Sequence, residues 1–497
     1  MTYIKEKLND TALFRQLYII DLFFCYVSFL QIPAYCFLVF LFCWGVYLVK
    51  KSLIENHTIL KLRFGLWIGA FLAFSCLSIL INFTFTLFYS VLMLFHVAIC
   101  FFVFYGMHTE KDFDFKSELF SVARLIVYIS TIANIIGMIC LMAGIRFEWF
   151  WIKFTIYENR FTGVFFNPNI LGFISVVALV CCHMLYKKDL LKSVKEPRVS
   201  IIWLVACVAT NLFSLMLCDS NASMVLALGY IIVYTVYVFF ADKTGISKPE
   251  KSVSKSKIFV KIVSIVLVGS FLIGTAFMFR VICQEGFAIV FSKTPSIVEI
   301  LSGDTSKQIE EDKNKKPSVK EDKKSDEITF SHENTNIDSG RFKLWKESIN
   351  LFKISPIIGI ANGNIVLYSE EYANGTLSFS YHKSDLHNGF LTILVSTGII
   401  GFLLFCIFGF RFAKHAAQHL FLQKKTFRND VYPCLFSFLF AYLFYAMFEK
   451  ALLYDISFMV MWFWLMMGYT SCYIAKFEPM LESQYLFHKK RLTRTLL

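Results

Sequence analysis

Long apolar runs recur along almost the whole of this sequence, and short polar or basic turns separate them. The first run extends from Leu17 to Val49 and would be roughly 50 Å long as one helix, because an α-helix rises about 1.5 Å per residue. The hydrocarbon core of a bilayer is only about 30 Å thick. The run must therefore be broken, and Pro33 marks the expected turn between two membrane spans.

Composition supports the same class of protein. With 57% hydrophobic and 17% charged residues, a chain of 497 residues is too apolar to be soluble. We expect an all-α polytopic membrane protein with about twelve transmembrane helices. After the first two, spans are predicted at Leu62–Leu80, Thr84–Tyr105, Leu119–Gly144, from Asn169, at Val199–Leu217, Ala222–Phe240 and Ile258–Met278, and from Asn388, Val431 and Tyr454.

The placement of basic residues predicts the orientation of these spans. The short connections that are rich in Lys and Arg all fall on one side of the predicted membrane, whereas the turns at Pro33, Asn82 and Asp219 carry no basic residue. Cytoplasmic loops are enriched in Lys and Arg. Both termini are therefore expected in the cytoplasm, with the loop around Arg160, the turn at Asp219 and the loop around Arg341 outside.

The same count divides the chain into regions. Residues 1–280 carry spans one to nine, with an outer interfacial loop at 145–168. Residues 281–387 form a long extracytoplasmic loop between spans nine and ten. Residues 388–475 carry the last three spans, and residues 476–497 form a basic cytoplasmic tail.

The long loop has two parts of different composition. Residues 303–336 consist almost entirely of polar and charged residues, which predicts disorder. Residues 339–387 are expected to be the functional part. An amphipathic helix is predicted there, because apolar residues recur at helical spacing at Phe342, Trp345, Ile349 and Phe352.

The sequence supports neither a redox cofactor, a zinc site nor ATP hydrolysis. It contains no CxxC, HExxH or phosphate-binding glycine loop, and the 14 cysteines lie mostly in apolar runs. His382 and His387 have four intervening residues, whereas helical metal ligands have three. We therefore expect no metal and no cofactor. The net charge of +13 lies in short loops between spans, which argues against nucleic acid as a partner.

Three polar residues suggest a reaction on an activated substrate. Arg160 and Arg341 are suited to bind a diphosphate, because a guanidinium stays charged and offers a planar fork of donors. His387 precedes a membrane helix, and an imidazole with an ordinary pKa of about 6.5 can take a proton from a hydroxyl. The alternative is that both arginines contact lipid headgroups and that His387 is an interfacial residue.

These residues lie in motifs that resemble a known family, the O-antigen ligase and polysaccharide polymerase superfamily. The motifs are RFTG at 160–163, NPNILG at 167–172, GRFKLW at 340–345 followed by Pro356 and Gly359, and HNGFL at 387–391 followed by Gly398 and Gly401. The resemblance covers roughly residues 160–405. It implies a metal-independent glycosyltransferase that uses undecaprenyl-diphosphate-linked sugars at the outer face of the bacterial plasma membrane.

By this resemblance, Arg160 and Arg341 would hold the diphosphate and His387 would be the base on the acceptor hydroxyl. The family often has Ser-Arg in the turn between spans seven and eight, where this chain has Asp219, Ser220 and Asn221. Arg280 or Lys383 could replace that arginine. Further substrate-binding candidates are Asn167, Asn169, Asp219, Trp345, His382 and Asn388.

Within the superfamily, the favoured function is a polymerase that joins lipid-linked repeat units of a capsule, exopolysaccharide or O-antigen. A ligase that transfers finished glycan to another acceptor is the first alternative, and a transporter of polysaccharide or lipid-linked oligosaccharide is the second. The expected partners are the lipid-linked oligosaccharides, the bilayer, and flippase and chain-length regulator proteins. A transporter would place functional charges near the bilayer midplane.

Overall fold

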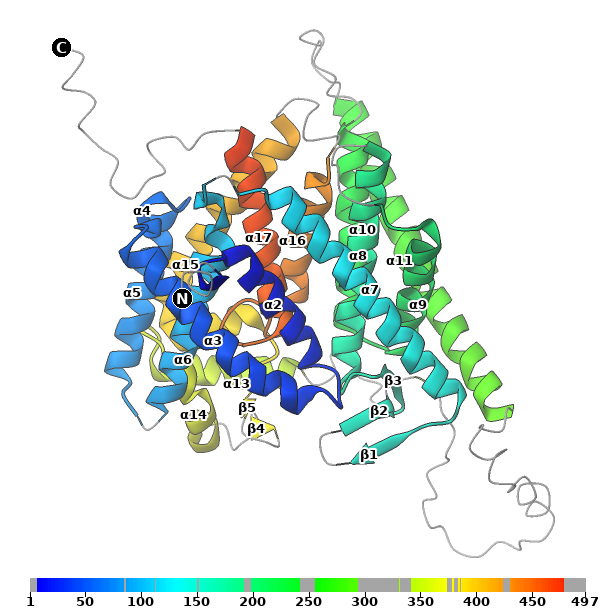
Figure 1. Ribbon diagram of the computed structural model, residues 1–497, viewed down its shortest axis with the longest axis horizontal. Helices are drawn as coiled ribbons and strands as arrows, with labels where there is room; N and C mark the ends of the chain where they lie inside the picture. Colours follow the sequence, from blue (N-terminus) through cyan, green and yellow to red (C-terminus); the bar gives the residue numbers. More distant parts are fainter. Residues whose placement is uncertain are drawn as a thin grey trace, which may run out of the picture.

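The computed structural model shows a bundle of helices (Figure 1). It describes residues 7–84, 86–111, 113–149, 152–191, 198–241, 255–293, 330, 341–372, 378–379, 383–384, 386–422 and 430–477. The N-terminal half contains α2 (Thr11–Phe24), α3 (Gln31–Ile54), α4 (Thr58–Lys61), α5 (Gly65–Ile81), α6 (Leu87–Ile99), η1 (Cys100–Phe104), η2 (Tyr105–Thr109), α7 (Phe115–Met142), α8 (Pro168–Leu191), α9 (Ile201–Leu217) and α10 (Asn221–Ala241). The C-terminal half contains α11 (Lys255–Lys293), α13 (Arg341–Ile354), η4 (Asn362–Asn364), α14 (Ile365–Tyr372), α15 (Gly389–Leu422), α16 (Tyr432–Tyr445) and α17 (Phe458–Phe477).

Length and composition identify eight candidate membrane-spanning helices among the described residues. Three shorter apolar helices, α5, α9 and α16, accompany them. The predicted class of a mostly helical, polytopic membrane protein is thus confirmed. A helix lies at each predicted span, but the number twelve and the side of the termini stay predictions. The helix α11 continues to Lys293, beyond the predicted end of its span at Met278.

The predicted turn at Pro33 is wrong by a few residues. α2 ends at Phe24 and α3 begins at Gln31, so the break between the two helices lies before Pro33. Pro33 itself lies in the first turn of α3. Proline is tolerated there because the first N–H groups of a helix have no intrahelical acceptor.

Residues 145–168, predicted as an interfacial loop, contain an antiparallel sheet of three strands. These are β1 (Phe147–Trp149), β2 (Ile152–Tyr157) and β3 (Arg160–Gly163), in the order β1-β2-β3. The sheet lies close to α7 because two glycines meet there: a Cβ on Gly137 would come within 2.8 Å of the Gly163 Cα. This close approach fixes the strand that carries Arg160.

The chain after α13 forms backbone hydrogen bonds with α15 at a break in that helix. Gly398 lies inside α15 with non-helical backbone angles (φ 64°, ψ −172°), so carbonyls near the break can accept hydrogen bonds from elsewhere. Ile360 N donates to Val395 O (3.0 Å), and Ile399 N donates to Pro356 O (2.8 Å). A side chain at Gly398 would collide with the backbone of Ile357. This interlock joins α13, which carries Arg341, to the helix that follows His387.

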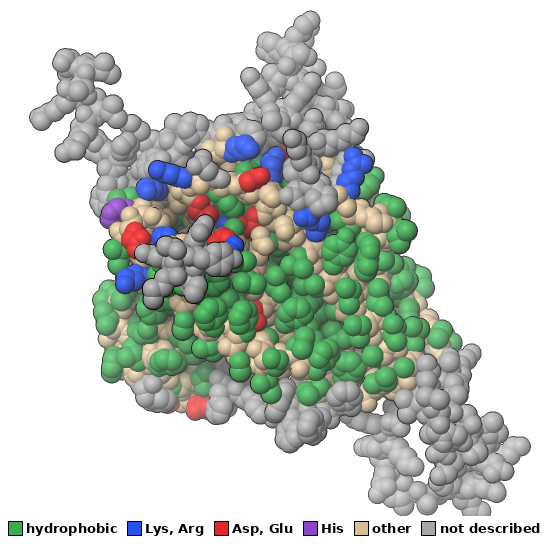
Figure 2. Space-filling view, in the orientation of Figure 1, with side chains coloured by type: hydrophobic (Ala, Val, Ile, Leu, Met, Phe, Trp, Pro, Cys, Tyr) green, Lys and Arg blue, Asp and Glu red, His purple; other side chains and the backbone are tan. Residues whose placement is uncertain are grey.

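The two ends of the bundle differ in character. In Figure 1, α13, α14 and strands β1 to β3 lie at one end, and α4 lies at the other. In Figure 2, Lys and Arg side chains gather at the end opposite to α13, and a broad hydrophobic band lies between the ends. We call the end with α13 and the sheet the site end.

Candidate functional site

Arg341 and His387 meet at a residue that the sequence analysis did not select, Glu449. Arg341 Nη2 donates to Glu449 Oε1 (3.0 Å), and its Nε donates to the carbonyl of Phe448 (3.1 Å). On the other side of the same carboxylate, His387 Nδ1 lies 3.4 Å from Oε2. The side chain of Glu449 is 9% exposed, that of Arg341 13% and that of His387 27%. One carboxylate therefore links the two predicted functional residues.

The turn between α16 and α17 holds Glu449 in place. Gly389 N donates to Ala446 O (2.7 Å), which joins the start of α15 to this turn. Tyr442 donates through its hydroxyl to Ala451 O (2.9 Å), and Trp464 Nε1 donates to Leu452 O (2.8 Å). Because three helices fix its backbone, the carboxylate is positioned before any ligand binds.

The surroundings of Glu449 favour its ionised form. Burial alone would raise the pKa of this carboxyl, but the hydrogen bonds from His387 and Arg341 and the positive charge of Arg341 outweigh it and lower the pKa. A carboxylate only accepts hydrogen bonds, so the proton of His387 is assigned to Nδ1. This tautomer leaves the lone pair of the ring on Nε2.

Arg160 lies on β3 beside the turn between α9 and α10. Its Nε donates to Cys218 O (2.8 Å), and Nη2 donates to Asn169 Oδ1 (2.7 Å) and to Asp219 O (3.2 Å). Burial lowers the pKa of the guanidinium, and the charge of Arg341 lowers it further. The three oxygens that accept hydrogen bonds from Arg160 are neutral, because two are backbone carbonyls and one is the amide oxygen of Asn169.

Arg280 on α11 reaches the same turn from the other side. It forms an ion pair with Asp219, and Nη1 donates to Asn221 Oδ1 (2.9 Å). Gln284, one turn further along α11, donates to Asp219 Oδ1 (3.0 Å) and to Phe330 O (2.8 Å). The Arg280 side chain therefore contacts the turn, Asp219 to Asn221, at which the sequence analysis expected Arg280 or Lys383 to replace a missing arginine.

Electrostatic interactions connect these groups into one site. The charges of Arg341 and Glu449 both act on Arg160, and Arg160 in turn repels Arg280. Coulomb interactions of this kind weaken with distance and with exposure to water. Arg341 and His387 thus contact Glu449, Arg160 and Arg280 contact the turn at Asp219, and the two groups interact through the charges of Arg160, Arg341 and Glu449.

The other predicted residues have more local roles or lie outside the described part. Asn388 caps α15, because its Oδ1 accepts from the N–H groups of Phe390 (2.9 Å) and Leu391 (3.0 Å). Asn167 Oδ1 accepts from Asn169 N (2.8 Å). The ring of Trp345 lies 5.9 Å from that of Phe448. His382 lies outside the described residues, and only the backbone of Lys383, in strand β5 (Lys383–Ser384), is described.

The predicted helix of the long loop is confirmed, but its packed face differs. α13 buries Leu344, Ser348 and Leu351 against the protein, whereas Phe342 and Ile349 of the predicted stripe are exposed. The predicted disorder of 303–336 concerns residues outside the described part, apart from Phe330, which is buried. Among the described residues, no group of three or more His, Cys, Asp or Glu side chains could hold a metal ion.

Glu449 was missed because its signal is weak in sequence. It is one acidic residue in a short turn between two apolar runs, with Lys450 beside it. Ionisable groups at the ends of membrane helices are frequent. Only the fold shows that this carboxylate faces Arg341 and His387.

The fold and the site together define a multi-pass membrane protein with an arginine-rich site at one end of its helix bundle. Residues 170–406 match the family model described as O-antigen ligase, which confirms the predicted resemblance to this superfamily. The match supports an enzyme of the ligase or polymerase type. It includes Arg280, Arg341 and His387, whereas Arg160 and Glu449 lie outside it. No curated protein matches the chain.

Proposed function

We propose that this protein is a polysaccharide polymerase that joins lipid-diphosphate-linked repeat units at the outer face of the plasma membrane. The observation that carries the proposal is the contact of Arg341 and His387 with the two oxygens of Glu449. One of these groups suits a leaving diphosphate and the other suits an attacking hydroxyl. Their separation by a single carboxylate puts both within reach of one sugar linkage.

The proposed step is a substitution at the anomeric carbon of the donor chain. The acceptor hydroxyl oxygen forms the new glycosidic bond, and the bond from the anomeric carbon to the diphosphate oxygen breaks. The electron pair leaves with the diphosphate, and the hydroxyl proton passes to His387 Nε2. Glu449 stabilises the imidazolium that forms, while Arg160, Arg280 and Arg341 stabilise the departing diphosphate.

The cellular side of the site is part of the proposal. Lys and Arg gather at the end of the bundle opposite to the site (Figure 2), and basic residues favour the cytoplasmic side. A site at the outer face has no access to cytoplasmic nucleotide sugars. Its substrate would be a repeat unit on undecaprenyl diphosphate, supplied by a flippase, with product length set by a chain-length regulator.

The test replaces His387 or Arg341 by alanine in cells that make the polymer. For a polymerase, we expect single lipid-linked repeats to accumulate at the outer leaflet while the polymer disappears. Lys343→Ala is the matched control, because Lys343 is an exposed cation on the same helix as Arg341. Normal polymer in well-inserted His387→Ala protein would refute the catalytic assignment.

The same experiment separates the alternatives. A ligase would leave full-length glycan on its lipid carrier, unattached to the final acceptor. A transporter would leave the lipid-linked material at the inner leaflet. Lectin binding to intact cells, compared with inverted vesicles, distinguishes the two leaflets.

A further inference from the structure

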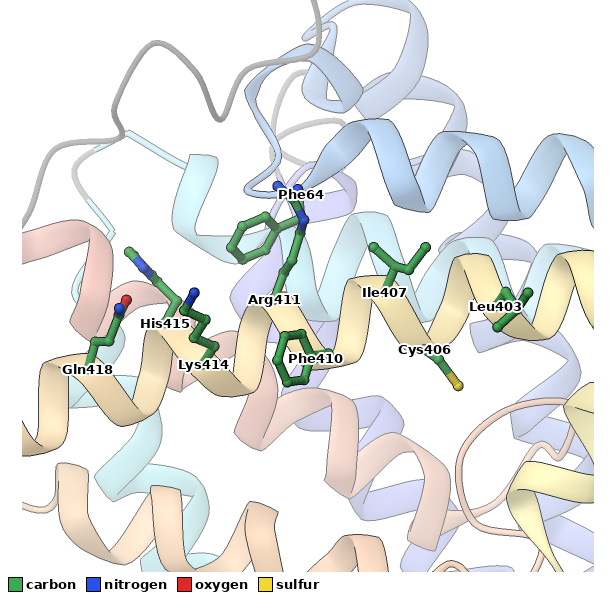
Figure 3. A pocket seen from close by; sticks show the side chains of 9 residues that line it. All are labelled: Phe64, Leu403, Cys406, Ile407, Phe410, Arg411, Lys414, His415 and Gln418. Carbon is green, nitrogen blue, oxygen red and sulfur yellow. The ribbon is translucent and has the colours of Figure 1, made fainter.

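A groove lies along α15 at the end of the bundle opposite to the site. Its volume is about 570 Å³, and it opens to the surface between α15 and the turn that precedes α5 (Figure 3). The lining residues are Phe64, Leu403, Cys406, Ile407, Phe410, Arg411, Lys414, His415 and Gln418. Eight of these nine residues come from α15, so one face of that helix makes most of the groove.

This face of α15 changes character along its length. Its lining residues are spaced by three and one alternately, which is the spacing of a continuous helical stripe. The half nearer the bundle centre is apolar, from Leu403 to Phe410. The other half, from Arg411 to Gln418, carries two cations and a histidine. The stripe thus offers an apolar path that ends at a cationic patch.

The length of α15 leads us to assign the cationic patch to the depth of a membrane interface. A helix needs about 20 residues to cross the hydrocarbon core, and α15 begins at Gly389. Counting 20 residues from there reaches about Phe410. Arg411 and Lys414 therefore fall at the headgroup level, and Leu403 and Ile407 fall among the acyl chains.

Neighbouring helices hold the patch in position. The guanidinium of Arg411 lies over the ring of Trp67 on α5, 5.3 Å from its centroid. The buried Arg63 donates from Nη1 to His415 Nε2 (2.8 Å). A guanidinium only donates, so His415 accepts at Nε2 and carries its proton on Nδ1. Figure 3 shows Arg411 extending from α15 toward Phe64.

We propose that this groove binds one anionic phospholipid from the leaflet opposite to the candidate active site. Arg411 and Lys414 bind the headgroup phosphate, and an acyl chain lies along Leu403, Ile407 and Phe410. None of the nine lining residues carries a carboxylate, so the groove attracts anions. The inference rests on the groove alone and is independent of the proposed polymerase activity.

The test measures lipid binding by purified full-length protein in a neutral detergent. The probes are phosphatidylglycerol and phosphatidylcholine, and native mass spectrometry counts the lipids that remain bound. We expect wild-type protein to retain one phosphatidylglycerol in preference to phosphatidylcholine. Arg411→Gln with Lys414→Gln should weaken binding about 30-fold, since each basic residue contributes about 1 kcal/mol and 1.4 kcal/mol is tenfold.

Two further variants make the result specific. Lys50→Gln with Lys51→Gln removes the same charge from the end of α3, away from the groove, and should leave lipid retention unchanged. Ile407→Trp should block the acyl path and weaken binding of the lipid while leaving the cations in place. Equal retention by wild type and the Arg411/Lys414 variant would overturn the proposal.

Inorganic phosphate distinguishes the two possible sources of the anion. Millimolar phosphate should not protect wild-type protein from thermal unfolding as the phospholipid does, because it gains nothing from the apolar path. If phosphate protects equally, and Ile407→Trp does not alter that protection, the ligand is a free anion and the lipid proposal is wrong.

Discussion

Glu449→Gln tests the central contact of the site with almost no change in shape. The amide oxygen can still accept from Arg341 Nη2, as the carboxylate does at 3.0 Å. The amide N–H₂, however, then faces His387 Nδ1, and two donors cannot bond each other. The imidazole must rotate or shift its proton to Nε2, the nitrogen that takes the substrate proton in the proposed step.

The expected losses follow from the contacts. A hydrogen bond to a charged group contributes about 1.5–3 kcal/mol. Losing the His387 contact should therefore lower kcat by about 10- to 150-fold, at 1.36 kcal/mol per factor of ten. Breaking a buried ion pair from one side costs about 3–5 kcal/mol of stability. Because Arg341 and His387 keep 13% and 27% exposure, we expect a cost near the low end of that range.

The assay follows polymer formation from a purified lipid-linked repeat by protein in proteoliposomes. Thermal unfolding of each variant ensures that rates are compared for folded protein. A double-mutant cycle with His387→Ala decides the route: if Glu449 acts through His387, Glu449→Gln should have little further effect on rate in the His387→Ala background. Equal losses in both backgrounds, or a wild-type rate for Glu449→Gln, would refute the reasoning.

Three further predictions concern the supports of the site. Gly398→Ala should destabilise the protein by more than about 1–2 kcal/mol, since its positive φ is strained for alanine and a Cβ would collide with Ile357; Gly409→Ala on the same helix meets nothing within 4 Å and should be neutral or stabilising by thermal unfolding. Arg280→Gln should lower kcat by about 10²-fold, the effect of losing one donor to a developing anion, and should also lower the unfolding temperature, because Asp219 loses its ion-pair partner. The stability advantage of wild type over Glu449→Gln should be present near pH 7 and shrink as pH falls below 4.5, the ordinary glutamate value, because a lowered carboxyl pKa stabilises the fold only while the group is ionised.

The class of protein and the positions of its helices followed from hydrophobic run lengths. A bilayer imposes one length on every span, so a helix can be predicted from composition before any contact is known. The same rule failed at Pro33, because proline fits the first turn of a helix as well as the turn before it. It also missed the sheet at β1 to β3, whose strand β2 reads IKFTIY, a β-branched and aromatic sequence typical of strands.

The site was predictable only in part. The motifs predict Arg160, Arg341 and His387 as site residues. The missing arginine at Asn221 led to the prediction that Arg280 or Lys383 replaces it, and Arg280 contacts Asn221 in the structure. Spacing along the chain does not reveal contacts between distant turns. Glu449 lies 108 positions from Arg341 and 62 from His387, so nothing local in the sequence pairs them. The close packing of Ile357 against Gly398 cannot be predicted from the sequence for the same reason.

The charges of the assembled site give a physical reason for its two carboxylates. Three guanidinium groups left unbalanced in a partly buried site would repel one another, and Glu449 and Asp219 each compensate one of them. With His387 neutral, these groups sum to about one positive charge, less than the two negative charges of a lipid diphosphate that carries a sugar. In the proposed step the diphosphate gains negative charge as the sugar leaves, and His387 becomes positive as it takes the proton. The summed charge of site and substrate stays at about −1, because the step only moves a proton and an electron pair. Each new charge, however, forms beside an opposite one, the imidazolium beside Glu449 and the diphosphate beside the arginines, which is the direction that lowers the barrier.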